Sequence, residues 1–287
     1  MKHIEELGYG TDWINKRLYD SIRVNTIKID PLTLKQRLES QGWILEQLPW
    51  YSYGFIVKNR TTELGNTLEH FLGYYYSQSV SSMIPVLALE PKGLILDMAA
   101  APGGKTSQIA QHSGDLIIAN DVNNARLNIL AANLQRLGVS NVIITRKPGQ
   151  NFHKTSIKFD RVLLDAPCSS LGTAMHNPRV LKQWSPKFSA KLSKLQKAMA
   201  ESAFLSLKKG GILVYSTCTI TVEENEEIIN HLISLGAKVE DINLDIPHHE
   251  GITDYKGKHY DNSISKCWRI HPDDLESEGF FIARLRR

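Results

Sequence analysis

The feature that most constrains the fold is an alternation of short apolar runs with longer helix-like segments, which begins near residue 90. A parallel strand is buried on both faces, so it reads as an unbroken apolar run, and each crossover to the next strand needs a helix. The pattern therefore predicts an α/β fold with a doubly wound sheet covered by helices on both faces. Strands are expected at 94–99, 116–121, 141–146, 160–166, 211–217, 238–242 and 279–285, and helices at 104–112, 123–137, 187–208 and 222–234.

The first part of the chain has a different pattern, typical of a small α+β module. Asp30 and Pro31 indicate a helix start, because an N-cap carboxylate precedes a proline at the first helical position, and Gly42 provides a stop. A Tyr-rich helix is expected to connect this module to the larger domain. The expected segments are a strand within 21–30, a helix within 30–42, strands within 43–50 and 53–59, and the connecting helix at 74–89.

The length and composition agree with two domains in a soluble protein. A chain of 287 residues with 42% hydrophobic and 22% charged residues suits one good-sized core and a smaller one. We place the division between an N-terminal module at 1–76 and a larger domain at 77–287. The apolar runs fall well short of the roughly 20 residues that cross a bilayer, and the N-terminus lacks a signal-peptide layout. No membrane partner is expected.

The cysteines and histidines indicate the compartment. The three cysteines, Cys168, Cys218 and Cys267, are an odd number without paired spacing, so neither a disulfide framework nor a metal site is expected. The histidines show no metal-ligand spacing either. Because reduced thiols are typical of the cytoplasm, we expect a cytoplasmic protein that uses no metal. Cys267 is expected to be a structural thiol.

The charge distribution offers one candidate nucleic-acid surface. The net charge is only +4, from 34 Lys and Arg against 30 Asp and Glu, and it says little about partners. The segment "KFSAKLSKLQK" carries four lysines and no acid, at spacings that place them along one side of a helix. Such a row can track the phosphates of a nucleic acid. A solvated helix face explains the pattern equally well. The four residues are Lys187, Lys191, Lys194 and Lys197.

A turn rich in small residues follows the first strand of the larger domain, in "DMAAAPGGKTSQIAQ". In doubly wound sheets, ligands bind beyond the carboxyl ends of the strands, and small residues let a ligand approach the backbone. The turn matches neither the dinucleotide pattern nor the full phosphate-loop pattern, so a phosphate grip by Lys105 and Thr106 is weakly supported. A tight strand-to-helix connection is the alternative. The turn consists of Ala99, Ala100, Ala101, Pro102, Gly103 and Gly104.

Asp121 adds a second indication of a cofactor. It ends the second strand of the larger domain, where an acid commonly binds the hydroxyls of a ribose. An adenosine cofactor without a pyrophosphate fits both this acid and the turn before it. Asp121 can instead cap the helix that follows, or do both.

Two cysteines are expected to converge on the same edge of the sheet. The run "VLLDAPCSSLGT" ends a buried strand in Asp165 and places Cys168 just beyond it, and "LVYSTCTI" ends another strand at Cys218. If the fold is correct, Asp97, Asp165 and Cys218 lie at the carboxyl ends of neighbouring strands, and both thiols face one cleft. A free cysteine is often only a small core residue. Two cysteines that each follow a central strand favour a functional role instead.

A thiol, an acid and an adenosine cofactor together suit one particular chemistry. Carbon 5 of cytosine is too weak a nucleophile to take a methyl group from a sulfonium. Addition of a thiolate to carbon 6 converts the ring into an enamine-like species that can do so. A second group must then remove the proton from carbon 5 so that the thiol can leave.

The motifs "MAAAPGGKT", "DAPCSSLGT" and "YSTCTITVEENE", in this order, resemble the signatures of the Sun (Fmu/Nol/Nop) family of RNA cytosine-5 methyltransferases. The resemblance extends to "SIRVNTIKID" and "GFFIARLRR", and so covers most of the chain. It implies a seven-stranded Rossmann-like fold with an antiparallel last strand, S-adenosylmethionine as the cofactor, and an RNA substrate. A tRNA is the expected substrate, with rRNA as the alternative, and a monomer is expected.

The resemblance also implies roles for individual residues. Cys218 matches the covalent nucleophile, and Cys168 matches the residue that assists proton removal and product release. DNA cytosine methyltransferases attack with the Pro-Cys thiol instead, so spacing alone does not assign these roles. Asp165 matches an acid that contacts the cofactor and the target base. The cofactor-binding positions implied are Ala99, Ala100, Ala101, Pro102, Gly103, Gly104, Lys105, Asp121, Arg126 and Asp165.

One departure from the family pattern concerns the adenine. Relatives carry an Asp after the third strand, whereas this chain has "TRKPGQNF", with Pro148 in that position. The Pro148 side chain cannot accept a hydrogen bond, so a backbone carbonyl or Gln150 is expected to replace the acid, and cofactor binding is expected to be weaker or differently organised.

Two other classes of function compete with methyl transfer. A non-catalytic RNA-binding protein would have no use for two placed thiols, and a nicotinamide-dependent oxidoreductase would need the missing dinucleotide pattern. In the methyltransferase, the target base must leave its stack to reach a thiol inside a cleft. The basic helix, Arg179 and the N-terminal module are expected to hold the RNA.

Overall fold

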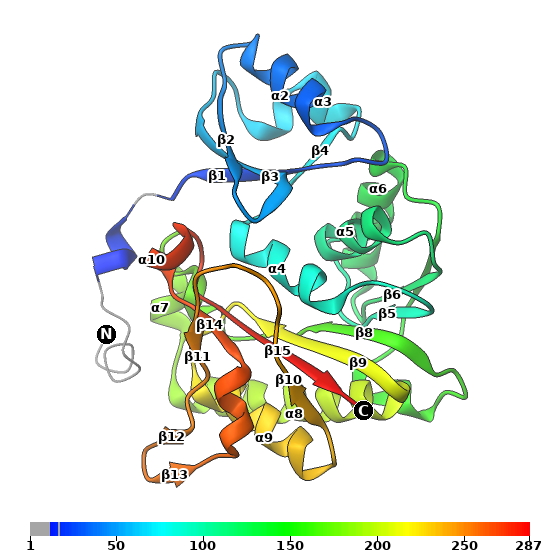
Figure 1. Ribbon diagram of the computed structural model, residues 1–287, viewed down its shortest axis with the longest axis vertical. Helices are drawn as coiled ribbons and strands as arrows, with labels where there is room; N and C mark the ends of the chain where they lie inside the picture. Colours follow the sequence, from blue (N-terminus) through cyan, green and yellow to red (C-terminus); the bar gives the residue numbers. More distant parts are fainter. Residues whose placement is uncertain (1–11, 17) are drawn as a thin grey trace.

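The computed structural model describes residues 12–16 and 18–287 and contains two main sheets (Figure 1). The smaller sheet has four strands in the order β2-β3-β1-β4, all antiparallel, and lies beside helix α4 in Figure 1. Asp30 caps α2 as expected, since its side chain accepts a hydrogen bond from the Thr33 amide. The elements of this module are β1 (Asp20–Val24), α2 (Pro31–Glu39), β2 (Ile44–Leu48), β3 (Tyr51–Asn59), α3 (Leu68–Phe71) and β4 (Tyr75–Ser77).

The larger sheet has nine strands, in the order β11-β14-β15-β9-β8-β5-β6-β7, with β10 also paired to β15. The five strands from β9 to β7 in this order are parallel, and β15 is antiparallel to β9. The doubly wound sheet and its antiparallel last strand are thereby confirmed. Two strands that the sequence did not predict, β11 and β14, extend the sheet beyond β15. The bounds are β5 (Ile95–Asp97), β6 (Ile117–Asn120), β7 (Val142–Thr145), β8 (Phe159–Asp165), β9 (Leu207–Thr217), β10 (Lys238–Glu240), β11 (His249–Glu250), β14 (Trp268–Ile270) and β15 (Phe280–Arg286).

Helices cover both faces of the larger sheet, and the central strands are buried on both sides as a result. In β8, Val162 and Leu164 belong to the cluster that contains Met199 of α8, whereas Leu163 belongs to the cluster formed with α4 and α5. This alternation explains why the strand reads as a continuous apolar run. A separate hairpin joins β12 (Asp254–Tyr255) to β13 (Lys258–His259). The helices are α4 (Val80–Leu89), α5 (Gly104–His112), α6 (Asn124–Leu137), α7 (Arg179–Gln183), α8 (Pro186–Ser206), α9 (Glu226–Ser234) and α10 (Pro272–Leu275).

The predicted connecting helix at 74–89 is wrong over its first six residues. Residues 75–77 form β4, which pairs with β1 through Tyr75 opposite Val24, and the helix begins only at Val80. Tyrosine is favoured in strands, and the free edge of β1 supplies the partner that a local pattern cannot show. The predicted helix at 222–234 is also divided, because Asn225 has non-helical angles between a short 3-10 helix and α9.

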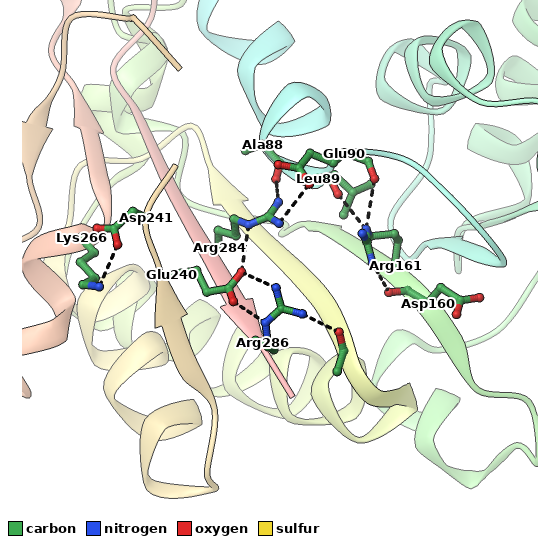
Figure 2. A network of polar contacts seen from close by, with 11 residues as sticks. Ala88, Leu89, Glu90, Asp160, Arg161, Glu240, Asp241, Lys266, Arg284 and Arg286 are labelled. Carbon is green, nitrogen blue, oxygen red and sulfur yellow. Dashed lines mark hydrogen bonds and ion pairs between the residues drawn. The ribbon is translucent and has the colours of Figure 1, made fainter. Parts of the chain in front are cut away.

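A network of polar contacts fixes α4 at the end of the sheet where the parallel strands begin (Figure 2). Arg161 of β8 donates from Nε to the carbonyl oxygens of Leu89 and Glu90, at 3.0 and 3.1 Å. Arg284 of β15 donates to the carboxylates of Glu90 and Glu240, at 3.3 and 3.2 Å. This end of the sheet is thus closed by structural contacts, and the opposite end holds the polar loops described next. Among the described residues, every helix is too short or too polar to cross a membrane.

Candidate active site

Cys168 and Cys218 lie next to each other at the carboxyl ends of two paired strands. Strands β8 and β9 are parallel neighbours, with Asp165 opposite Ser216, so the loops after them leave the sheet side by side. The two Sγ atoms are 3.3 Å apart, and both thiols are free and half-buried. The predicted convergence of the two cysteines on one cleft is confirmed.

Contacts between the two loops maintain this arrangement. The hydroxyls of Ser169 and Thr219 are 2.8 Å apart, and the Gly172 amide donates to the Cys218 carbonyl oxygen at 3.0 Å. A Cβ at Gly172 would lie 2.0 Å from the carbonyl oxygen of Gly279, so only glycine fits there. The loops therefore form one rigid unit that carries both thiols.

The environment of the thiol pair favours a proton on Cys168. The hydrogen bond with Cys218 raises the pKa of the Cys168 thiol well above its ordinary value, and burial adds to this effect. Ser170 lies beside the pair, with its Oγ 3.5 Å from the Cys218 sulfur. In the free protein, Cys168 is thus a protonated thiol at neutral pH.

Asp165 is paired with a partly buried lysine, Lys105. Lys105 Nζ lies 2.7 Å from Asp165 Oδ2 and 2.8 Å from the Ser82 hydroxyl, while Ser216 donates to Asp165 Oδ1 at 2.8 Å. Burial opposes the charge on Lys105, but the Asp165 carboxylate outweighs burial and raises the pKa of the ammonium group. Lys105 is therefore a fixed cation at the base of the cleft, and its partner is a carboxylate of the protein.

A cavity of about 540 Å³ opens in front of the two thiols. Its size suits a nucleoside-sized ligand. A smaller adjoining cavity of about 210 Å³ shares part of its wall and is lined by Ser82, Ala100, Pro102, Gly104 and Lys105. The predicted positions are thus divided between two adjoining cavities, except for Gly103, which lines neither. The larger cavity is lined by Ala99, Ala101, Asp121, Arg126, Pro148, Gln150, Asp165, Cys168 and Cys218, together with residues of α8.

The cavity wall around Asp121 fits the ribose of an adenosine cofactor. Asp121 is buried, and its Oδ1 accepts from the Asn123 amide at 2.9 Å. Its Oδ2 is buried, accepts no hydrogen bond and forms an ion pair with a guanidinium nitrogen of Arg126 at 3.4 Å. Asn123, not Asp121, caps α6, because its side chain accepts from the Arg126 amide. This buried acid and the small residues beside it fit S-adenosylmethionine.

The turn after β5 brings its backbone close to this cavity. Arg126 also donates to the Ala101 carbonyl oxygen, and Asn133 donates to that of Pro102 at 2.9 Å, so helix α6 holds the turn in place. The peptide bond between Ala101 and Pro102 is cis. Gly103 has φ of 109°, a conformation that favours glycine. The small side chains are thus explained by the turn itself as well as by a ligand.

Asp97 is the most strongly perturbed carboxyl group of the cavity wall. It is fully buried, and its Oδ2 accepts a hydrogen bond from Thr106 Oγ1 at 2.7 Å, while its Oδ1 has no hydrogen-bond partner. Burial raises the pKa of Asp97 from 3.8 to about 7, although the bond from Thr106 opposes this shift. The side chains of the "GGKT" motif are both engaged by carboxylates of the protein, which leaves neither for a phosphate.

The segment after β7 places Pro148 and Gln150 in the cavity wall, as the sequence predicted. Asn120 holds this segment, because it accepts from the Lys147 amide and donates to the Lys147 carbonyl oxygen, both at 2.9 Å. No acid occurs between Thr145 and Lys154. Gln150 and the local backbone are the groups available in place of the family's Asp.

Helix α8 connects the cavity to the candidate RNA surface. Leu195 and Met199 line the cavity, while the four lysines of the same helix are exposed. In the described part of the chain these lysines form no ion pair. Arg179 of α7 is exposed near the start of this region. The lysine row is therefore free for a polyanion.

Several residues of the site escaped the sequence analysis, among them Ser82, Ser170, Ser216 and Glu224. Their contacts join segments far apart in the chain, and nothing in the local pattern marks them. Glu224 had a partial signal, since it lies in the motif that follows Cys218. Cys267 is buried and lies outside the cleft. Among the described residues no cluster of three potential metal ligands occurs.

Both parts of the chain are similar to known protein families. Residues 84–286 match the family described as 16S rRNA methyltransferase RsmB/F. Residues 9–80 match the family described as the N-terminal domain of 16S rRNA methyltransferase RsmF. The tRNA (cytosine(49)-C(5))-methyltransferase of Pyrococcus abyssi is 43% identical over 281 residues, covering 96% of this chain and 90% of the relative. The ribosomal RNA small subunit methyltransferase F of Shewanella amazonensis is 41% identical over 278 residues, covering 93% of this chain but 58% of the relative.

Solved structures show the same fold. A methyltransferase homolog protein from Pyrococcus horikoshii superposes with a TM-score of 0.86 at 33% identity, covering 100% of this chain and 98% of the other. NSun6 from Pyrococcus horikoshii, determined with SFG, superposes with a TM-score of 0.83 at 25% identity, covering 99% and 94%.

Proposed function

This chain belongs to the RsmB/F family of S-adenosylmethionine-dependent RNA cytosine-5 methyltransferases, and on that premise we propose that it methylates a cytidine of tRNA through Cys218 and Cys168. The single observation that carries the proposal is the 3.3 Å separation of the two sulfur atoms at the mouth of a nucleoside-sized cavity. The tRNA relative matches along nearly its whole length, which favours tRNA, whereas the chain spans little more than half of the rRNA relative.

The two thiols share one proton at the start of the reaction, and this proton is on Cys168. Cys218 adds as a thiolate to carbon 6 of cytosine, so that a sulfur–carbon bond forms and the π electrons of the ring move to carbon 5. S-adenosylmethionine would supply an electrophilic methyl group, which carbon 5 would take while the electron pair of the broken sulfur–methyl bond stayed on the sulfur. Asp121 and Arg126 would hold this cofactor, with the turn at residues 99–105. Asp165, fixed by Lys105, would contact the base.

Release of the product depends on the loss of the hydrogen bond between Cys168 and Cys218. Once the Cys218 sulfur is bonded to carbon, it no longer raises the pKa of Cys168 as strongly, so Cys168 can release its proton to solvent. The Cys168 thiolate then takes the proton from carbon 5, the electron pair of that bond restores the ring double bond, and Cys218 leaves as a thiolate. The proton count of the pair is thereby returned to its starting value.

The RNA would be held outside the cleft. We assign the phosphates to the lysine row of α8 and to Arg179, and RNA binding to the module at 1–76, whose last strand β4 extends one residue past this division, to Ser77. We also propose that the protein acts as a monomer in the cytoplasm, where free cysteines are typical.

Cysteine substitutions with labelled S-adenosylmethionine and tRNA test the proposal. Cys218→Ala should abolish turnover and any covalent RNA adduct, whereas Cys168→Ala should accumulate an adduct that is slow to release. Cys267→Ala, at the third thiol, is the matched control and should keep both activities. An adduct formed by Cys218→Ala would reverse the two roles. RNA that is bound but never labelled on cytosine would support a binding protein instead, and bisulfite sequencing of cellular RNA would identify the substrate.

A further inference from the structure

Glu224 is a fully buried carboxylate that only neutral groups contact. Its Oε2 accepts from the Ser169 amide and from Gln196 Nε2, both at 2.9 Å. Its Oε1 accepts from the hydroxyls of Ser189 and Thr221, at 2.6 and 3.1 Å. Within residues 12–16 and 18–287, no Lys or Arg forms an ion pair with it. A buried charge without a counter-ion is costly and is tolerated here because four donors satisfy it.

These contacts hold the loop that carries Cys168 at two points. Ser169 follows Cys168, and its amide is bound to Glu224, while Gln196 also donates to the carbonyl oxygen of Pro167 at 2.9 Å. The two groups therefore hold the residues on both sides of Cys168. The 2.8 Å contact between Ser169 and Thr219 extends the connection to the Cys218 loop.

The same carboxylate connects the thiols to the lysine row. Ser189 and Gln196 are seven residues apart on α8, which is about two helical turns, so both lie on the face directed toward Glu224. The lysines of this helix are exposed. A shift of α8 on RNA binding would be transmitted through Glu224 to the Cys168 loop.

We propose that Glu224 is a positioning residue that sets both the place and the basicity of Cys168 for release of the methylated base. This proposal rests on the roles given above to Cys168 and Cys218. After the hydrogen bond with Cys218, burial and the charge of Cys218, the negative charge of Glu224 also raises the pKa of Cys168. That charge persists in the covalent adduct, when the Cys218 sulfur is neutral, and it keeps Cys168 a strong enough base to take the proton from carbon 5.

Glu224→Gln tests this role, because it keeps the shape and removes the charge and two acceptor positions. Release of the RNA adduct should slow by about tenfold, with KM for RNA little changed. The pH at which release is half-maximal should move down, since Cys168 loses a nearby negative charge. Glu223→Gln, one residue earlier and with no hydrogen bond to the thiol loops among the described residues, is the matched control and should behave as the parent. An unchanged pH profile with normal release would overturn the proposal.

A second measurement does not require methylation. The rate of iodoacetamide alkylation at Cys168, followed by mass spectrometry against pH, reports the ionisation of this thiol directly. Glu224→Gln should shift that profile to lower pH, and an unshifted profile would overturn the proposal even if the enzyme methylated another substrate. A shifted profile in a protein that does not methylate RNA would instead reject the proposed function alone. If Glu224→Gln fails to fold, Ser189→Ala removes one donor and should slow release to a smaller extent.

Discussion

Replacing Asp97 by Asn should stabilise the fold, and the gain should depend on pH. Asp97 ends the central strand β5, is fully buried, and has one carboxylate oxygen without a hydrogen bond. Asn has the same shape, and its amide oxygen can still accept from Thr106. The substitution therefore removes an ionisable group while it keeps the packing. The substitution thus removes the decrease in the free energy of unfolding that ionisation of Asp97 causes.

The magnitude follows from the pKa of Asp97. A rise from 3.8 to about 7 makes ionisation about 4 kcal/mol less favourable in the folded protein than in the unfolded chain. Below the ordinary value of 3.8 both states keep the proton and no penalty exists. As the pH rises from about 4 to about 7, the unfolded chain releases its proton first, so unfolding becomes more favourable, and the full penalty is present above that range.

Urea unfolding of the cofactor-free protein can measure this effect. Between about pH 5 and pH 8, the stability advantage of Asp97→Asn should grow by about 2–3 kcal/mol, because part of the penalty is already present at the lower pH. Asp160→Asn is the control: burial opposes ionisation, but Lys208 holds the pKa of Asp160 below its ordinary value, so its effect is constant over this range. An advantage of Asp97→Asn that is equally flat would refute the reasoning.

Three further changes test other parts of the molecule. Gln150→Ala should weaken cofactor binding about three- to tenfold in calorimetric titration, and an unchanged affinity would exclude Gln150 as the substitute for the missing acid. Lys191→Ala with Lys194→Ala should lower the slope of log affinity for RNA against log salt by roughly 1.4, and an unaltered slope would remove α8 from the RNA surface. Arg23→Met should cost about 2–4 kcal/mol of stability and weaken cofactor binding, because buried Arg23 joins β1 to the Gly104 carbonyl oxygen at 3.2 Å; equal affinity would show that the contact is only structural.

The parts of the site that could be predicted from sequence are those that depend on strand ends. Cys168 and Cys218 each follow a buried apolar run, and parallel neighbours in a doubly wound sheet place such positions at one edge. Helix α5 begins and ends where the glycine turn and the following residues predicted. These features arise within short segments, so a local pattern is enough to indicate them.

The parts that could not be predicted depend on contacts between distant segments. Lys105 and Asp165 are 60 residues apart, and their pairing requires the order of β5 and β8 in the sheet. Strand β14 was missed because its central residue is Arg269, which is buried against Glu226 at 2.6 Å and hides the apolar pattern. Residues 75–77 read as helix until the edge of β1 is known to be their partner.

The distribution of charge explains how a polyanion can deliver one base to this cleft. Inside the cavities, Lys105 is paired with Asp165 at 2.7 Å and Arg126 with Asp121 at 3.4 Å, so these cations have little attraction left for a phosphate. The lysines of α8 are exposed and free of ion pairs in the described chain, and their attraction is screened by salt rather than by a protein carboxylate. Under the proposed function, the backbone of an RNA would be held at the rim, and an unstacked, uncharged base would enter the cleft. In "GGKT", which resembles the end of a phosphate loop, the lysine is instead paired with a carboxylate of the protein, Asp165.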